Sequence, residues 1–220
     1  MALLLSVERP SAQPGGSWHW GRENFDPATG VVIHDAGKIG GTGGGMSMLL
    51  AREAVTGRES VTLEYDVTLS ANWQWVKSGK FPGLFSGETD FGPSRAPDGR
   101  NGFTIRPVWA AGGRIGVYVY DMHVQGYGRG PTSDKPCLVA GRTHRVRLST
   151  KLNRPGRRDG VVTLAVDGVV QAQMNDAEFR VDPALTLTGV WWTCFYGGGD
   201  ASWAPTERVL CQLQNMRLAA

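Results

Sequence analysis

The segment Val61-Thr62-Leu63-Glu64-Tyr65-Asp66-Val67-Thr68-Leu69 alternates apolar and polar side chains along its whole length. Successive side chains of a β-strand point to opposite faces, so this alternation predicts a half-buried strand with one apolar face. Asp167-Gly168, which lies between two valines, is a strong signal for a two-residue hairpin. Similar strands are predicted at 102–109, 114–123, 143–150, 160–167, 169–174, 185–196 and 207–218.

The composition supports the same fold class. The 220 residues include 31 glycines and 8 tryptophans, and no long stretch shows a helical period. Many short strands joined by glycine turns favour an all-β fold, a β-jelly-roll sandwich of two curved antiparallel sheets. We expect a single domain over residues 1–220, with residues 1–45 as an irregular N-terminal segment packed on it. One outer face of such a sandwich is concave and suits a polymer chain.

Charge and cysteine content exclude several classes of protein. The chain has 23 Lys and Arg against 20 Asp and Glu, a net charge of +3, and its densest basic run lies in a Pro-Gly turn at 154–158. No apolar run is long enough to span a bilayer. We therefore expect a monomer with no nucleic-acid and no membrane partner. The three cysteines and four histidines form no zinc-like spacing, so we expect no metal and no cofactor, with Cys194 and Cys211 as buried thiols rather than a bridge.

A second hairpin is predicted over residues 102–120, and its register brings four polar side chains together. With a tight turn at its centre, Arg106 faces Tyr118 and Thr104 faces Tyr120, whereas the apolar residues of both strands meet on the core face. Directly opposed side chains lie about 5 Å apart at Cβ, so all four polar groups can touch one small ligand. The alternative is an exposed strand face without function, because Tyr and Thr favour strands in any case.

Lys80 is the second cationic residue of interest, after Arg106. It precedes Phe81-Pro82-Gly83, a pattern typical of a strand that leads into a rigid turn. A lysine at that place is held near the sheet. The alternative is an ordinary surface lysine.

Four motifs in sequence order resemble the successive motifs of the alginate lyases of polysaccharide lyase family 14, which includes viral and molluscan enzymes. They are Gly79-Lys80-Phe81-Pro82-Gly83-Leu84, Gly102-Phe103-Thr104-Ile105-Arg106-x-x-Trp109, Tyr118-Val119-Tyr120 and Phe195-Tyr196-Gly197-Gly198-Gly199-Asp200-x-x-Trp203-Ala204-Pro205. The resemblance runs from about residue 60 to residue 218. Each motif alone is weak, but four in order at compatible spacing are fairly specific.

The resemblance implies a β-jelly-roll that cleaves a uronate polysaccharide, such as alginate, polymannuronate or glucuronan, by β-elimination without a metal or cofactor. The family's catalytic residues correspond to Lys80, Arg106, Tyr118 and Tyr120. Thr104 stands where the family usually has serine; it keeps the hydroxyl and adds a methyl group. Pro107 also departs from the pattern, and because it lacks a backbone donor we expect a bulged or unpaired strand there.

This chemistry suits the residue types. Elimination removes the C5 proton of a uronate and expels the C4 glycosidic oxygen. Arg106 can grip the carboxylate with two parallel hydrogen bonds and neutralise the developing enediolate, with Thr104 holding the same group. Lys80 or a tyrosinate is the candidate base, and a tyrosine hydroxyl is the candidate acid. We favour Tyr118 and Tyr120 as the proton-transfer pair, and the sequence leaves open which tyrosine takes which role.

Other segments leave alternatives open. The polar stretch 86–101 is either a lid over the substrate or a plain surface loop, and its Arg95 and Arg100 are candidate substrate-binding residues. A carbohydrate-binding sandwich without catalysis is the main rival function. A glycoside hydrolase would need two carboxylates on one face, for which only Glu64 and Asp66 offer themselves. The activity implies secretion, although the first ten residues do not resemble a signal peptide.

Overall fold

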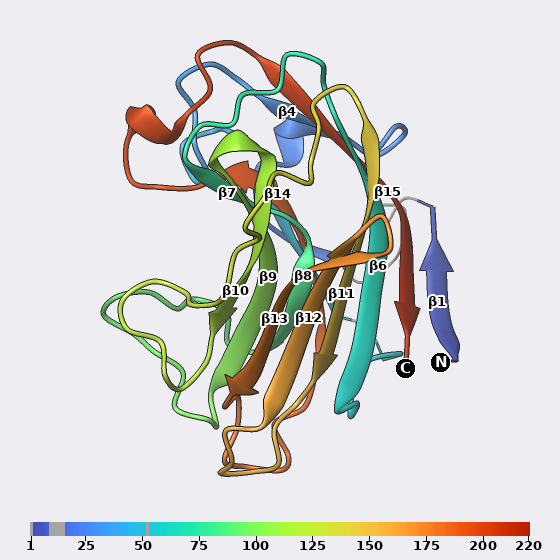
Figure 1. Ribbon diagram of the computed structural model, residues 1–220, viewed down its shortest axis with the longest axis vertical. Coiled ribbons are helices and arrows are strands. Elements are labelled where there is room, and N and C mark those ends of the chain that lie inside the picture. The colour runs from blue at the N-terminus through green and yellow to red at the C-terminus, as the bar shows by residue number, and fades with distance from the viewer. Residues whose placement is uncertain (1, 9–15, 52) are drawn as a thin grey trace.

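Two antiparallel β-sheets packed face to face form the whole molecule (Figure 1). The computed structural model describes residues 2–8, 16–51 and 53–220, and over these residues it contains strands and short 3-10 turns but no α-helix. The all-β jelly-roll class predicted from the sequence is confirmed. No helix among the described residues is long and apolar enough to cross a membrane.

The larger sheet has eight strands, and its order places β6 at the centre. From edge to edge its strands are β13 (Val169–Ala177), β12 (Gly160–Val166), β11 (Thr143–Lys151), β6 (Ser60–Leu69), β15 (Val209–Ala219), β4 (Val31–His34) and β3 (Phe25–Asp26), with β1 (Leu3–Val7) also paired to β15.

The smaller sheet has seven strands and carries the polar hairpin. Its strands are β10 (Arg114–Tyr120), β9 (Gly102–Ala110), β7 (Ser78–Lys80), β14 (Gly189–Tyr196), β5 (Met46–Ala51) and β2 (Gly16–Trp20), with β8 (Gly83–Gly87) paired to both β9 and β14. The described residues also contain the 3-10 turns η2 (Arg22–Asn24), η3 (Ala111–Gly113) and η4 (Ala201–Trp203).

The core lies between the two sheets. The apolar residues of the opening segment, from Val61 to Leu69, are all buried, as the alternation predicts. The predicted hairpin at Asp167-Gly168 also forms, and Asp167 adopts a left-handed backbone with φ of 50° there. Cys194 and Cys211 are buried free thiols, which confirms that prediction.

The N-terminal segment is more regular than the sequence suggests. Residues 1–45 were expected to be irregular, but they contribute β1, β2, β3 and β4 to both sheets; residue 1 and residues 9–15 of this segment lie outside the described residues. These strands are two to five residues long, and glycines separate several of them. Strands this short show no sustained alternation, because their pairing to longer neighbours decides their conformation.

The hairpin of β9 and β10 has the register predicted from the sequence. Arg106 pairs with Tyr118, and Thr104 pairs with Tyr120. The expected bulge at Pro107 is absent, because Pro107 pairs with Val117 without a register shift. On its other side Pro107 faces the break between β7 and β8, where its carbonyl accepts the Phe81 amide at 3.0 Å. Pro107 has no N–H group to donate to Phe81 in return, and it has no ladder partner in β7 or β8, so the expected unpaired strand is found on this side only.

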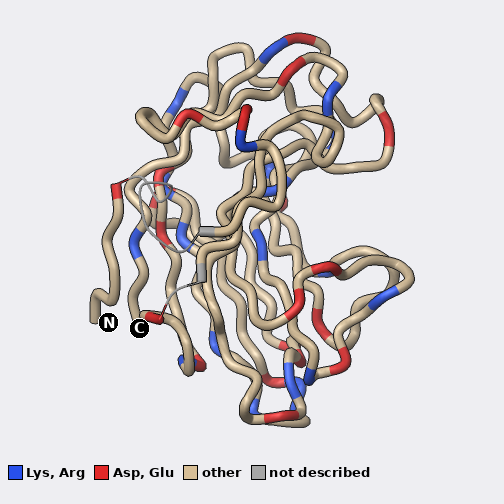
Figure 2. The backbone as a smooth tube through the Cα atoms, turned by 180° about the vertical axis from the view of Figure 1, so that it is seen from behind, with Lys and Arg blue, Asp and Glu red and all other residues tan. Residues whose placement is uncertain are grey.

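Along the described chain, positions of Lys and Arg are interspersed with positions of Asp and Glu (Figure 2). Glu64 and Asp66, the only candidates for a glycosidase carboxylate pair, lie on the larger sheet and form ion pairs with neighbouring arginines. Arg145 reaches Asp66 at 2.7 Å, and Arg147 reaches Glu64 at 2.7 Å. Both carboxylates are therefore engaged in ion pairs, and they lie in the sheet that does not carry the polar hairpin. These two facts argue against a glycoside hydrolase.

Candidate active site

Three strands of the smaller sheet bring the predicted polar residues together on its outer face. β9 supplies Thr104 and Arg106, β10 supplies Tyr118 and Tyr120, and the end of β7 supplies Lys80. Lys80 pairs with Val108 of β9 and with Phe195 of β14, so it is held between two strands rather than on a free surface. The interpretation of Lys80 as an ordinary surface lysine is wrong.

The four ionisable groups form a continuous cluster. The Lys80 ammonium lies 3.8 Å from the centre of the Tyr118 ring, and the Arg106 guanidinium lies 5.9 Å from the same centre. The Tyr118 and Tyr120 hydroxyls are 3.5 Å apart and share a weak hydrogen bond. A single sugar carboxylate and its neighbouring carbon atoms can therefore reach both cations and both phenols.

Both cations are buried, and neither has an acidic partner among the described residues. Arg106 is 6 % exposed and Lys80 is 9 % exposed. The Arg106 Nε and the Thr104 Oγ1 are buried without any hydrogen-bond partner in the described part of the chain. Buried charges are normally paired. This arrangement is costly for folding, and it provides donors that match an incoming carboxylate.

Burial also changes the acidity of the two cations. Desolvation, assisted by the nearby Arg106 charge, lowers the pKa of Lys80 to about 7. Desolvation lowers the pKa of Arg106 to about 10, although the two tyrosines oppose that change. At neutral pH Arg106 keeps its charge, whereas a large fraction of Lys80 is neutral and can accept a proton.

Trp191 of β14 supports the Arg106 side chain. The guanidinium lies 4.1 Å from the centre of the Trp191 ring, and the indole N–H donates to the Ser47 hydroxyl at 2.7 Å. Gly83 lies opposite Trp191, and a Cβ there would come within 2.8 Å of Arg106 Cγ, so the glycine lets the arginine cross to the indole. Packing therefore requires glycine at position 83.

The sequence does not separate Trp191 from Trp73, Trp75, Trp192 and Trp203, each of which could stack on a sugar ring or pack in the core or at its rim. Trp191 and Trp192 are adjacent in a strand, so one of them must point away from the core. Trp192 is fully buried in the core. That alternation is the signal that identifies Trp191 as the residue facing Arg106.

We expect Trp191→Leu to raise KM about tenfold, because a desolvated cation–π contact contributes up to about 2 kcal/mol. Trp191→Phe keeps an aromatic face under Arg106 and should restore most of the affinity. Steady-state kinetics on a polyuronate measure both values. Equal KM values for Trp191→Leu and the wild type would show that the indole does not support substrate binding.

A cavity of about 450 Å³ opens beside Lys80 and Tyr118. Tyr127 and Trp203 supply aromatic rings at its margin, and Gly198 packs so closely on Trp203 that a Cβ would lie 2.1 Å from the indole ring. Flat aromatic rings and glycine backbone suit a sugar ring. The lining residues are Ser78, Lys80, Tyr118, Tyr127, Gly197, Gly198, Gly199 and Trp203. Tyr127, which is 70 % exposed, was missed because it lies in a loop without any repeating pattern.

The loop before β9 reaches the same cluster. Phe91 stacks on Tyr120 with 6.1 Å between the ring centres, which favours the lid interpretation of residues 86–101 over that of a detached loop. The two arginines of this loop are less well placed. Arg95 is paired with Glu88, the Arg100 side chain is exposed, and neither lines the cavity. Their predicted contact with substrate remains a prediction.

His19 of β2 contacts Trp191 edge to face, with 6.1 Å between the ring centres, whereas the other three histidines lie apart from the cluster. His123 approaches Glu178 at 2.7 Å, and His144 approaches Asp167 at 2.7 Å. His34 is buried in the core, where desolvation lowers its pKa to about 3. Within residues 2–8, 16–51 and 53–220, no cluster of His, Cys, Asp and Glu is arranged to hold a metal ion.

The fold defines a protein of the jelly-roll class that carries a cluster of buried cations and tyrosines on one sheet. The polysaccharide lyase 14 family matches residues 32–216, so the chain belongs to that family and is a polysaccharide lyase. Its substrate is a polysaccharide.

Solved structures share the fold. The alginate lyase of Aplysia kurodai superposes with a TM-score of 0.82 at 19% identity, covering 100% of each chain. Alginate lyase Aly36B in complex with alginate tetrasaccharide has a TM-score of 0.81 at 20% identity, covering 97% of this chain and 95% of the other. The endo-β-1,4-glucuronan lyase of Trichoderma reesei has a TM-score of 0.61 at 14% identity, covering 98% and 94%. No curated protein sequence matches this chain significantly.

Proposed function

We propose that the protein cleaves an anionic, uronate-containing polysaccharide by β-elimination. One observation carries this proposal: Arg106 Nε and Thr104 Oγ1 are buried without a hydrogen-bond partner among the described residues, on the same face as buried Lys80 and two tyrosines. A carboxylate bound there would take two parallel hydrogen bonds from Arg106 and one from Thr104. Structural neighbours that act on alginate and on glucuronan support the same substrate class.

The pKa values favour Lys80 as the base and Tyr120 as the acid. Lys80 is partly neutral near pH 7. Burial raises the pKa of Tyr120 above its usual value, and Tyr118 adds to the rise. The phenol is therefore protonated at neutral pH and can donate its proton to the leaving oxygen. Tyr118 contacts both groups and would hold them in register.

The proposed elimination breaks the C5–H and C4–oxygen bonds of one uronate. Lys80 removes the C5 proton, and the electron pair of that bond forms the C4–C5 double bond. The C4–oxygen bond breaks, and the leaving oxygen takes the Tyr120 proton. The products are a chain with an unsaturated uronate at its new non-reducing end and a chain whose protonated glycosidic oxygen, on C1, makes an ordinary reducing end. Arg106 stabilises the enediolate charge that develops on the carboxylate.

The direct test is incubation with alginate, polymannuronate and glucuronan, followed by the ultraviolet absorbance of the unsaturated product. Absorbance should rise on at least one of these polymers, and the polymer that reacts fastest identifies the preferred uronate. Binding to all three polymers without any rise would instead support the rival function, a carbohydrate-binding protein without catalysis.

The pH dependence tests the role of Lys80. Only neutral Lys80 can accept a proton, so kcat/KM should rise with pH through about 7, the pKa of this residue in the free enzyme. A bound carboxylate favours the ammonium form, so the corresponding limb of kcat should lie at higher pH. The residual activity of Lys80→Met should lack this limb. An unchanged limb in that variant would assign it to another group.

We further propose that the protein acts as a monomer outside the cell, where polysaccharides of this class are accessible. The interspersed charges in Figure 2 support the absence of a nucleic-acid partner. Size-exclusion chromatography with light scattering tests the monomer, and fractionation of the native culture tests the location.

A further inference from the structure

The loop that follows β10 lies directly against the tyrosine pair. A Cβ at Gly128 would lie 2.4 Å from Cε1 of Tyr118, so the Gly128 backbone packs on that ring. The next residue returns alongside β10, where the Arg129 amide donates to the Val119 carbonyl at 2.9 Å and the Val119 amide donates to the Arg129 carbonyl at 2.8 Å. The loop therefore touches the active-site face of β10 at the point where the phenols meet.

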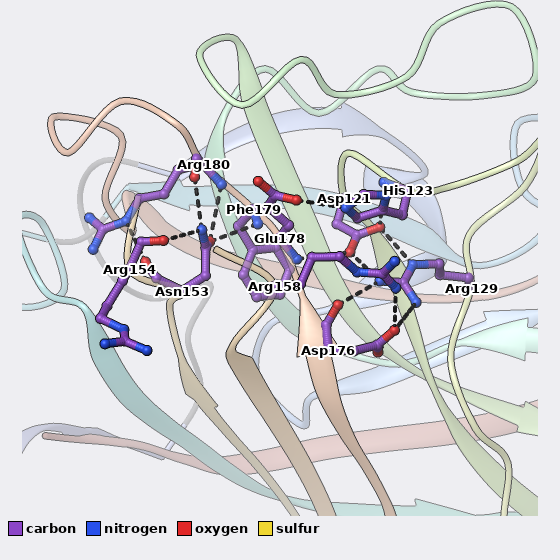
Figure 3. A network of polar contacts seen from close by, with 10 residues as sticks. All are labelled: Asp121, His123, Arg129, Asn153, Arg154, Arg158, Asp176, Glu178, Phe179 and Arg180. Atoms are coloured by element: carbon purple, nitrogen blue, oxygen red, sulfur yellow. Dashed lines mark hydrogen bonds and ion pairs between the residues drawn. The ribbon is translucent and has the colours of Figure 1, made fainter. Parts of the chain in front are cut away.

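A buried ion pair fastens this loop. Asp121, the residue after Tyr120, is fully buried, and its carboxylate accepts two hydrogen bonds from the Arg129 guanidinium, at 2.8 and 2.6 Å. The same carboxylate accepts the backbone amides of His123 and Glu178, each at 3.1 Å (Figure 3). Four donors on one buried carboxylate hold the start and the end of the loop together.

The polar network continues from the Asp121–Arg129 ion pair (the clamp) to the edge of the larger sheet. The Arg129 guanidinium also lies 3.3 Å from Asp176 of β13, and Arg158 reaches the same carboxylate at 2.5 Å (Figure 3). Arg129 belongs to both parts of the network, whereas Arg158 contacts only the outer part. The two arginines therefore differ in one respect that matters here, contact with Asp121.

We propose that Asp121, Arg129 and Gly128 are positioning residues for proton transfer. The Asp121–Arg129 ion pair holds the Gly128 backbone against Tyr118 and Tyr120, and this contact keeps the two hydroxyls in the geometry that protonation of the leaving oxygen requires. None of the three residues lines the cavity. This inference rests on the role proposed above for Tyr120.

The electrostatics of Tyr120 agree with this assignment. Burial and the neighbouring Tyr118 raise the pKa of Tyr120, whereas Arg106 and a hydrogen bond from the Gly128 backbone act in the opposite direction. The charged and titratable groups that act on this phenol are thus Tyr118 and Arg106, and Lys80 lies 3.8 Å from the centre of the Tyr118 ring. An amide that stabilises the phenolate helps Tyr120 to release its proton.

The first test compares two arginines of the same network. Arg129→Gln should lower kcat about a hundredfold, the cost of a misplacement of about 1 Å in a catalytic group, with little change in KM. Arg158→Gln removes an arginine from the same Asp176 but leaves the clamp intact, so its kcat should equal that of the wild type. Equal kcat values for Arg129→Gln and Arg158→Gln would overturn the proposal.

Arg129→Gln leaves the buried Asp121 unpaired, which costs about 3–5 kcal/mol and can unfold the protein. A second variant, at Gly128, keeps the ion pair. Gly128 does not have a positive φ, so Gly128→Ala fits the backbone and its methyl group displaces the Tyr118 ring. We expect a loss of kcat of tenfold or more, by the same argument of misplacement. Gly126→Asn is the control, because Gly126 has a left-handed φ that Asn tolerates and no atom near its Cβ position.

A third readout does not depend on activity. Carbon-labelled tyrosine NMR, assigned with Tyr120→Phe, follows the ring resonances of Tyr120 in the protein without substrate. The Tyr120 ring resonances at neutral pH should shift in Arg129→Gln and Gly128→Ala but stay unchanged in the two controls, because only the first two variants alter the contact of Gly128 with the tyrosine pair. Identical Tyr120 resonances in all variants would refute the positioning role. If the wild type cleaves no polyuronate, the proposed function fails while these resonances still decide whether the clamp positions Tyr120.

Discussion

Arg106→Met should abolish turnover while leaving the protein folded and more stable than the wild type. Removal of one donor that stabilises developing charge costs about a hundredfold to a thousandfold in kcat. Arg106 carries two such donors and the charge itself, so we expect the loss to reach at least the upper end of that range. The rate of formation of unsaturated product measures it.

The gain in stability follows from the same geometry. Arg106 is 6 % exposed and has no acidic partner among the described residues, so the folded state carries an uncompensated buried charge. Exchanging buried ionic groups for well-packed apolar ones stabilises proteins by about 1–4 kcal/mol. Thermal unfolding should therefore show a higher midpoint for Arg106→Met. Inactivity combined with a lower midpoint would mean that the arginine serves the fold, and retained activity would remove it from the site.

Arg106→Lys separates charge from geometry. Lysine keeps the positive charge but cannot form two parallel hydrogen bonds to a carboxylate. We expect this variant to bind substrate weakly and to recover only a small part of the lost kcat. Full recovery of kcat would show that the positive charge is sufficient and that two parallel hydrogen bonds to the carboxylate are not required.

Tyr120→Phe should lower kcat by about a hundredfold to ten-thousandfold, the usual contribution of a positioned acid. Tyr118→Phe should cost about tenfold, because its hydroxyl only shares a weak hydrogen bond with Tyr120 and its ring still faces Lys80. The double variant should resemble Tyr120→Phe, since residues that act together are not additive. Single-turnover kinetics report these values directly.

Tyr196→Phe is the matched control for this comparison. Tyr196 lies on the core side of β14 and donates to the Gln74 carbonyl at 2.8 Å. Its loss should lower stability by about 1 kcal/mol and leave kcat unchanged. If Tyr118→Phe proves the more damaging of the two site variants, the roles of acid and positioning group must be exchanged.

The hairpin of β9 and β10 and its polar face follow from local sequence patterns. Alternation fixes which side of a strand each residue occupies, and a short turn fixes the register. These two rules are sufficient to place Thr104 opposite Tyr120 and Arg106 opposite Tyr118, as the hairpin has them. Both pairings join residues of the same hairpin, so local sequence is sufficient to predict them. The same local rules failed for residues 1–45, whose strands are too short to carry a pattern.

The surroundings of that face depend instead on tertiary packing. Trp191 lies under Arg106 because β14 runs beside the broken strand of β7 and β8, and Gly83 leaves space for the arginine to cross. The burial that lowers the pKa of Lys80 likewise comes from neighbouring strands, not from its own segment. The clamp of Asp121 and Arg129 holds a loop with no repeating pattern. Packing between segments distant in sequence sets desolvation and contact, and no local pattern encodes either.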